Sequence, residues 1–207
     1  MLTRLLMLLV AYLFGSIPVS FLIARAVAGV DLRTVGSGNT GATNVYRVAG
    51  AGWAVPAFLG DALKGALPVL AALHLQSQSS TAEAYWVAGA GMLAVLGHLF
   101  PPWLRFRGGK GVATSFGVML VLAPGPALLA LAVGAALTFA FRLVSAASLA
   151  AALALPVLVY VFKAGPAKSW LALALGVLIF LSHHENLGRL IRGEEKAISR
   201  NQSNEKL

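Results

Sequence analysis

The residues best suited to chemistry lie in three short polar segments, each set between long apolar runs. The first segment, residues 36–47, brings glycines, hydroxyls, amides and an arginine together within twelve positions. Glycines let backbone N–H groups turn toward one point, and the side chains add further donors, which together suit a phosphate-like anion. A glycine-rich connector without a ligand would explain the glycines but not the donors beside them. The predicted anion-binding residues are Gly36, Ser37, Gly38, Asn39, Thr40, Gly41, Thr43, Asn44 and Arg47.

This segment also matches the GxGxxG pattern of dinucleotide-binding folds, and Asp61 follows at about the twenty-residue spacing that such folds use. That pattern requires a strand before the glycines and a helix after them. Here apolar sequence of membrane-helix type lies on both sides. The sequence context therefore excludes a nucleotide-binding Rossmann unit.

The second segment opens the next apolar run with the tetrad Gly108-Gly109-Lys110-Gly111, followed by Thr114 and Ser115. Free N–H groups at a helix N-terminus favour an anion, and Lys110 adds a full positive charge. The tetrad is not a Walker A motif, because Gly111 stands where that motif needs Ser or Thr. We therefore predict phosphate binding without nucleotide hydrolysis. The alternative is a basic anchor at the membrane surface, to which Arg105 and Arg107 would belong.

The third segment begins His183-His184-Glu185-Asn186 and continues through Arg189 to Glu195. In a helix, His183 and Asn186 share one face and offer hydrogen bonds to an anion. The segment has too few histidines and carboxylates for a metal site, and the sequence indicates neither a metal nor a cofactor. Residues 193–207 are predicted to form a charged, solvated cytoplasmic tail.

Three ionisable residues lie within or at the end of apolar runs. Asp61 and Lys64 are three positions apart, and such residues inside a membrane usually pair with each other or line a polar cavity. An internal ion pair and a direct catalytic role are both consistent with this spacing. His98, which ends the third apolar run just before two prolines, is either a packed interhelical histidine or a supporting residue of the second segment.

Composition places these segments in a membrane protein. Of 207 residues, 58% are hydrophobic and only 11% are charged, whereas soluble domains carry roughly 25% charged residues. Cysteine is absent, which excludes disulfides and thiolate chemistry. The net charge of +9 comes from basic residues in short loops, which suits anionic lipids or phosphorylated substrates and not nucleic acid. A cleaved signal peptide is the alternative for the first apolar run, but that run is long and many others follow.

We predict an all-α, polytopic fold with seven transmembrane helices in a single domain, 1–207. The deciding stretch is residues 112–141, which is apolar for thirty residues but interrupted by Pro124-Gly125-Pro126. One kinked helix gives six spans, whereas two short helices give seven and bring all three polar segments to one face. Most basic residues then share that face, with Arg4, Lys163 and Lys168 opposite. The positive-inside bias makes the basic face cytoplasmic, with the N-terminus outside and the C-terminus inside.

The chain resembles the bacterial acyl-phosphate-dependent glycerol-3-phosphate acyltransferases. The resemblance rests on GSGNTGATNVYR at 36–47, GDALKG at 60–65, GHLFPPWLRFRGGKGVAT at 97–114 and HHENLGRLIRGEE at 183–195. It implies a seven-helix protein of the bacterial cell membrane with its active site on the cytoplasmic face. It also implies acyl transfer from acyl phosphate to glycerol 3-phosphate, which yields lysophosphatidic acid and inorganic phosphate.

The resemblance assigns the catalytic set Ser37, Arg47, Lys110, His183 and Asn186. Ser37 and Arg47 would bind or orient glycerol 3-phosphate with help from His183 and Asn186. Lys110 and its glycines would hold phosphate, and Glu195 would brace the third segment. Attack by the glycerol hydroxyl, assisted by substrate phosphate, is favoured over a covalent acyl-Ser37 intermediate, which stays open.

Two other functions fit parts of the sequence. A small transporter of a phosphorylated solute would suit the broken helices and the intramembrane Asp61 and Lys64, but the polar segments gather on one side and no inverted repeat is visible. A lipid-binding protein without activity leaves the polar segments unexplained. The expected partners are glycerol 3-phosphate, acyl phosphate and membrane lipid, with functional coupling to the enzyme that makes acyl phosphate.

Overall fold

The computed structural model describes residues 1–76 and 80–198. These residues form helices joined by turns, and no strand occurs among them. Residues 77–79 and the end of the predicted tail, 199–207, lie outside the described residues. The elements are α1 Leu2–Gly15, α2 Val19–Ala28, α3 Ala42–Ala49, α4 Ala51–Leu75, α5 Thr81–Leu99, the 3-10 turn η1 Pro102–Leu104, α6 Val112–Leu122, α7 Pro124–Phe141, α8 Val144–Val161, α9 Pro166–Ser182 and α10 His184–Ile191.

Several of these helices are long and apolar enough to cross a bilayer. Five segments qualify within the described residues, and α9 with α10 forms a sixth if their 64° bend is counted within one span. The five are Leu2–Ala28, Ala51–Leu75, Thr81–Leu104, Pro124–Phe141 and Val144–Val161. An all-helical membrane protein is thereby confirmed. Seven crossings stay a prediction, since α6 has only 11 residues.

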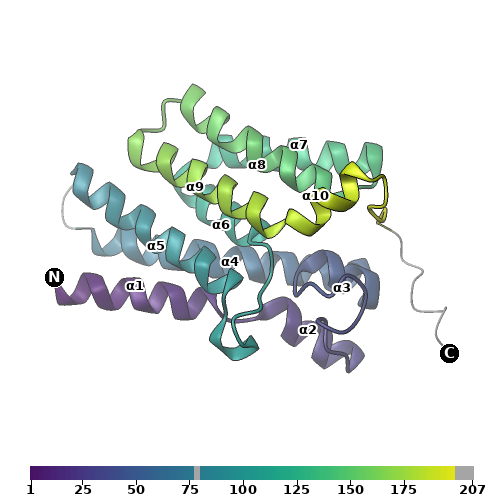
Figure 1. Cartoon of the computed structure of the whole chain (residues 1–207). Coiled ribbons are helices and arrows are strands. Elements are labelled where there is room, and N and C mark those ends of the chain that lie inside the picture. The colour runs from purple at the N-terminus through teal and green to yellow at the C-terminus, as the bar shows by residue number, and fades with distance from the viewer. Residues whose placement is uncertain (77–79, 199–207) are drawn as a thin grey trace.

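The predicted break in the thirty-residue run is confirmed. α6 ends at Leu122, and α7 starts at Pro124. Proline suits the first position of a helix because its missing N–H would have no partner there. Figure 1 shows α7, α8 and α9 on one side of α6, and α1, α4 and α5 on the other.

The first apolar run is not one continuous helix, as the sequence suggested, but two. α1 ends at Gly15 and α2 begins at Val19, with Pro18 between them. Proline cannot donate the helical hydrogen bond, and its ring clashes with the preceding turn. The break leaves the carbonyl of Ile17 outside the helical pattern, where it accepts a hydrogen bond of 2.8 Å from Lys64 Nζ of α4.

The first polar segment is also more ordered than a loop. Its second half forms α3, which packs with α2 and α4 around a small core of Ala24, Leu32, Val45 and Ala57. α3 therefore gives the residues from Thr43 to Arg47 fixed positions on a helical face.

Glycines bring pairs of helices close together. A Cβ at Gly117 of α6 would lie 1.9 Å from the carbonyl oxygen of Ala62 in α4, and a Cβ at Gly65 of α4 would lie 2.2 Å from the carbonyl oxygen of Thr114. A Cβ at Gly15 of α1 would lie 2.1 Å from the carbonyl oxygen of Ala94 in α5. Small residues allow such close approach, and close approach stabilises helix pairs within a membrane.

Gly117→Ala is therefore expected to destabilise the protein by about 1–3 kcal/mol, the usual effect of overpacking a tight interface. Thermal unfolding of the purified protein in detergent measures the change. Gly52→Ala in α4 is the matched control, because a Cβ there meets nothing within 4 Å. Equal melting temperatures for the two variants would contradict this account of the α4–α6 contact.

Candidate functional site

A cavity of about 550 Å³ receives side chains from all three polar segments. Its polar lining comes from the segment around α3, from the start of α6 and from α10 with the residues after it. Its apolar lining comes from α4, α6, α7 and α8 and includes Phe58, Phe116, Met119, Leu131, Phe139 and Leu155. One cavity thus joins a polar part at the loops to an apolar part among the helices.

Most of the predicted site residues meet in this cavity, but not all of them do. The cavity is lined by Ser37, Asn39, Gly41, Thr43, Asn44, Arg47, Asp61, His98, Lys110, Gly111, His183, Asn186 and Glu195. Gly36, Gly38, Thr40, Lys64, Gly108, Gly109 and Thr114 are not among its lining residues.

The first segment is folded by the side chain of Asn44, which is 1% exposed. Its Oδ1 accepts a hydrogen bond of 3.0 Å from the backbone N–H of Ser37. Its Nδ2 lies 2.9–3.0 Å from the carbonyl oxygens of Leu32, Val35 and Asn39. The Asn44 amide therefore holds the loop together, and the exposed Ser37 is left to face the cavity.

Gly36 shows why this loop needs glycine. Its φ of +61° lies in the left-handed region, and a Cβ would stand 2.1 Å from Asn44 Oδ1. A side chain here would displace the amide that organises the loop. Gly36 thus acts through Asn44, which explains its absence from the cavity lining.

Arg47 lies in the last turn of α3 and is half-buried beside the third segment. Burial lowers the pKa of its guanidinium, and the nearby Glu195 carboxylate opposes that shift. An arginine stays protonated even so. It therefore brings a permanent, partly dehydrated positive charge to the cavity.

The glycines of the second segment position Lys110. The N–H groups of Gly108 and Gly109 donate to the carbonyls of Leu99 and His98 at 3.0 and 3.2 Å, so they are occupied at the end of α5. A Cβ on Gly109 would lie 2.1 Å from Nε2 of His98. Lys110 and Gly111 line the cavity at the start of α6, and the φ of Gly111, +80°, lies in the left-handed region.

Thr114, a predicted phosphate-binding residue, does not line the cavity, whereas its neighbour Ser115 does. Thr114 is fully buried and packs against Gly65 in the α4–α6 contact. Ser115, one position later, lines the cavity. The helical turn decides this, because residues one position apart in a helix point about 100° away from each other.

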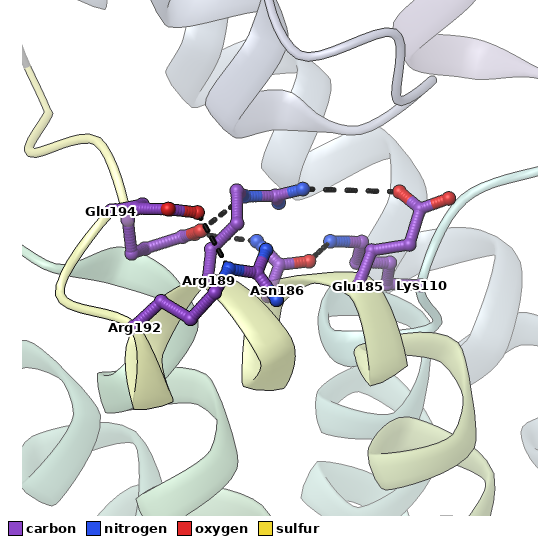
Figure 2. Close-up of polar contacts among 7 residues, drawn as sticks. Lys110, Glu185, Asn186, Arg189, Arg192 and Glu194 are labelled. Carbon is purple, nitrogen blue, oxygen red and sulfur yellow. Dashed lines mark hydrogen bonds and ion pairs between the residues drawn. The ribbon is translucent and has the colours of Figure 1, made fainter.

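Figure 2 shows the hydrogen-bonded network that joins the second and third segments. Lys110 Nζ donates to Asn186 Oδ1. Asn186 Nδ2 donates to Glu195 Oε1 at 2.5 Å, and Arg189 Nε donates to Glu195 Oε2 at 2.7 Å. Glu195 thus fixes both partners, which agrees with the bracing role expected for it. Burial would raise the pKa of Glu195, but these hydrogen bonds lower it below its usual value.

Burial lowers the pKa of Lys110 to about 8, while the carboxylates of Glu195 and Glu185 partly counteract the shift. Desolvation disfavours a lone ammonium group. A bound phosphate would restore the favourable surroundings of the charge. A bound anion is therefore expected to stabilise the charged form of Lys110.

His183 is held in one tautomer. Its Nδ1 lies 2.8 Å from the carbonyl oxygen of Ile179, and a carbonyl can only accept, so Nδ1 carries the proton. The other ring nitrogen, Nε2, is left as a hydrogen-bond acceptor. His183 is buried and lines the cavity one turn of chain before Asn186.

Asp61 lies beneath the polar part in a buried cluster. Its carboxylate is 2.7 Å from Lys64 Nζ, accepts a hydrogen bond of 2.6 Å from Ser20 and lies 3.7 Å from His98 Nδ1. The predicted internal ion pair is confirmed. The cluster links α2, α4 and α5, and through His98 it supports the glycines before Lys110.

Several polar lining residues were not predicted as members of the site: Ser115, Thr138, Ser145, Ser148 and Lys196. Ser115 was visible beside Lys110, but Ser145 gives no motif signal, and Lys196 looked like one more charge in a basic tail. The apolar lining was equally hidden, because its members resemble every other residue of a membrane helix.

The segment after α10 is charged and mostly exposed, but two of its residues are held by the helices. Glu195 is bound by Asn186 and Arg189 of α10, and the N–H of Ile198 donates a hydrogen bond of 2.7 Å to the carbonyl of Arg142 between α7 and α8. Glu195 and Lys196 also line the cavity. The solvated tail from residue 193 stays a prediction, and its first residues also contribute to the site.

The cavity of this helical membrane protein joins cationic and hydrogen-bonding side chains to an apolar space, an arrangement suited to the class of enzymes that join phosphorylated solutes to lipid chains. Comparison with known proteins narrows the class. The family model described as glycerol-3-phosphate acyltransferase matches residues 5–193. The chain belongs to the glycerol-3-phosphate acyltransferase family.

The curated relatives carry the same description. The glycerol-3-phosphate acyltransferase of Syntrophotalea carbinolica is 47% identical over 189 residues, covering 91% of this chain and 94% of that protein. The glycerol-3-phosphate acyltransferase of Geotalea daltonii is 43% identical over 200 residues, covering 97% of this chain and 100% of that protein.

Crystal structures of a family member share the fold. One shows PlsY (YgiH), an integral membrane glycerol 3-phosphate acyltransferase, in its glycerol 3-phosphate form. It is 38% identical, with a TM-score of 0.88 over 95% of this chain and 96% of that one. A second shows PlsY in its lysophosphatidic acid form, 35% identical with a TM-score of 0.85 over 96% of each chain.

Proposed function

We propose that this enzyme transfers an acyl group from acyl phosphate to glycerol 3-phosphate. The products are 1-acyl-glycerol 3-phosphate (lysophosphatidic acid) and inorganic phosphate, in the first acylation step of phospholipid synthesis. The observation that carries the proposal is the single cavity that joins cationic residues to an apolar space among α4, α6, α7 and α8. The glycerol 3-phosphate and lysophosphatidic acid forms of the related PlsY support the acceptor and the product.

The chemistry needs positioning more than activation, because an acyl phosphate is a mixed anhydride with a good leaving group. The hydroxyl oxygen of glycerol 3-phosphate attacks the acyl carbonyl carbon, and the bond from that carbon to the phosphate oxygen breaks. The hydroxyl proton passes to substrate phosphate, which leaves as inorganic phosphate. Arg47 and Lys110 hold the phosphate groups, and Ser37, His183 and Asn186 orient the reactants by hydrogen bonds.

Purified protein incubated with acyl phosphate and glycerol 3-phosphate tests the proposal. Release of phosphate together with lysophosphatidic acid is the expected result. Acyl-CoA and acyl carrier protein serve as alternative donors in parallel. The absence of product with every donor would overturn the acyltransferase proposal, and transport of glycerol 3-phosphate by the same protein in vesicles would favour the transporter instead.

The direct route competes with a covalent acyl-Ser37 intermediate. Ser37 lines the cavity beside α3, and no hydrogen bond to its Oγ occurs within residues 1–76 and 80–198. A nucleophilic serine normally has a base within hydrogen-bond reach. Acid quenching during turnover, followed by mass spectrometry of the peptide that contains Ser37, decides the point. An acylated Ser37 would overturn direct attack.

We also propose seven crossings, with the N-terminus outside and the active site and C-terminus at the cytoplasmic face of a bacterial cell membrane. The break before α7 at Pro124 and the 64° bend after α9 support it, since a chain that turns at a membrane surface needs such breaks between its helices. Reporter fusions at Gly125 and at the C-terminus are expected to lie on opposite sides. Fusions on the same side would exclude this topology. A cytoplasmic face also allows coupling to the enzyme that makes acyl phosphate.

The pKa of Lys110 gives a pH prediction. Below pH 8 the ammonium is charged and attracts phosphate, and above it the group loses its proton, because its pKa is lowered to about 8. The value of kcat/KM for glycerol 3-phosphate is therefore expected to fall as pH rises through about 8. The second pKa of a phosphate ester is about 6, so substrate ionisation acts only on the acid side.

Lys110→Arg is the control for this pH effect. Arginine keeps its charge throughout the range, so the alkaline fall is expected to disappear whatever the variant's absolute rate. A pH profile of kcat/KM with unchanged slope in Lys110→Arg would show that another group titrates.

A further inference from the structure

Lys196 lines the cavity although no motif contains it. It lies in the segment 193–198 that follows α10. The neighbouring Glu195 is fixed on one side by Asn186 and Arg189, and Ile198 is fixed on the other by its hydrogen bond to Arg142. A residue between two such anchors has little freedom to leave the cavity mouth. The backbone thus holds Lys196 beside the site, with its side chain on the cavity lining.

The charges on the cavity lining indicate that the site needs the Lys196 ammonium to balance its substrates. Two of the carboxylates near the cavity already have partners, since Asp61 pairs with Lys64 and Glu195 pairs with Arg189. The remaining cations on the lining are Arg47, Lys110 and Lys196. The proposed reaction brings in two phosphate groups, each carrying roughly −1.5 to −2 at neutral pH. Arg47 and Lys110 together supply two positive charges against a total of roughly −3 to −4, so roughly −1 to −2 would stay unbalanced.

Lys196 also has no competing partner among residues 1–76 and 80–198. It makes no hydrogen bond or ion pair with another residue in the part of the chain that the structure describes. Lys110, in contrast, already donates to Asn186. An ammonium group with all of its donors available can meet a phosphate without first breaking an existing contact.

We infer that Lys196 is a third phosphate-binding cation of the site, and this inference rests on the proposed acyl transfer. Its anchor at Arg142 lies at the turn between α7 and α8, and the adjoining helix ends contribute Thr138, Phe139 and Ser145 to the cavity lining. Lys196 therefore stands beside the entrance to the apolar part. Acyl phosphate, glycerol 3-phosphate and the product each carry a phosphate group, and Lys196 would bind each of them by the same charge-assisted hydrogen bond. Kinetic measurements with each substrate distinguish which phosphate group it binds.

Lys196→Gln tests the inference in the full-length protein reconstituted in detergent micelles. Losing a charge-assisted hydrogen bond to phosphate is expected to raise KM for one of the two substrates roughly tenfold, with a much smaller change in kcat. A rise for acyl phosphate places Lys196 at the donor, and a rise for glycerol 3-phosphate places it at the acceptor. Lys196→Arg keeps the charge and is expected to restore most of the affinity.

Arg192→Gln is the matched control. It removes the same charge from the residue just before that segment, but Arg192 is exposed, pairs with Glu194 as Figure 2 shows and does not line the cavity. Unchanged kinetics are expected. If Arg192→Gln raises KM as much as Lys196→Gln does, the effect is one of general surface charge and the inference fails. The inference also fails if Lys196→Gln leaves both KM values unchanged. An unaltered protein without any acyl transfer would instead refute the proposed function.

Discussion

Lys110→Met is expected to lower kcat/KM for acyl transfer by roughly 10²–10³-fold, the usual effect of removing one charged group that stabilises a transition state. The lysine is placed by a rigid arrangement, since Gly108 and Gly109 are bound to the end of α5 and Asn186 accepts its hydrogen bond. Methionine fills a similar volume but offers neither charge nor donor. Steady-state phosphate release, measured against both substrates, gives the ratio.

Arg107→Gln is the control for this prediction. Arg107 is an exposed cation in the same segment and does not line the cavity. Its loss changes the charge of the protein equally, and the rate is expected to stay near that of the unaltered protein. Melting temperatures of both variants check that each is folded. A folded Lys110→Met protein with nearly normal kcat/KM would remove Lys110 from the site.

Much of the site was predictable because its polar residues are out of place among apolar ones. Donors such as Ser37, Arg47 and Lys110 have no reason to cluster in short membrane loops unless they bind something. The break at Pro124 was equally readable, since proline cannot continue a helix from within. Polar segments within apolar sequence can thus be recognised without a structure, and the structure brings them to one cavity.

The remaining features depend on packing that no local pattern encodes. Asn44 and Ser37 look alike as polar loop residues, but one is buried at the centre of the loop and the other faces the cavity. Lys196 could not be separated from the surrounding basic residues, because the contacts of Glu195 with α10 and of Ile198 with Arg142 hold its segment at the cavity. The apolar lining depends on which helices pack against each other, and the composition of the helices does not predict that packing.

Asp61→Asn is expected to have the largest effect on stability. It leaves Lys64 as a buried charge without its carboxylate partner, and breaking a buried ion pair in this way costs about 3–5 kcal/mol. For a protein of this size the melting temperature should fall by on the order of 10 °C. Asp31→Asn is the matched control, since Asp31 pairs with Arg33 at the surface and such exposed pairs contribute little.

The double variant Asp61→Asn/Lys64→Met separates the two roles that the sequence left open for this pair. Removing both charges is expected to restore much of the lost stability, because no uncompensated ion stays buried. If the pair only fixes the packing of α2, α4 and α5, activity returns with stability. If Asp61 takes part in the reaction, the double variant melts near the unaltered protein but stays inactive. We expect activity to return, because the carboxylate of Asp61 is already bound by Ser20 and Lys64, although Asp61 lines the cavity.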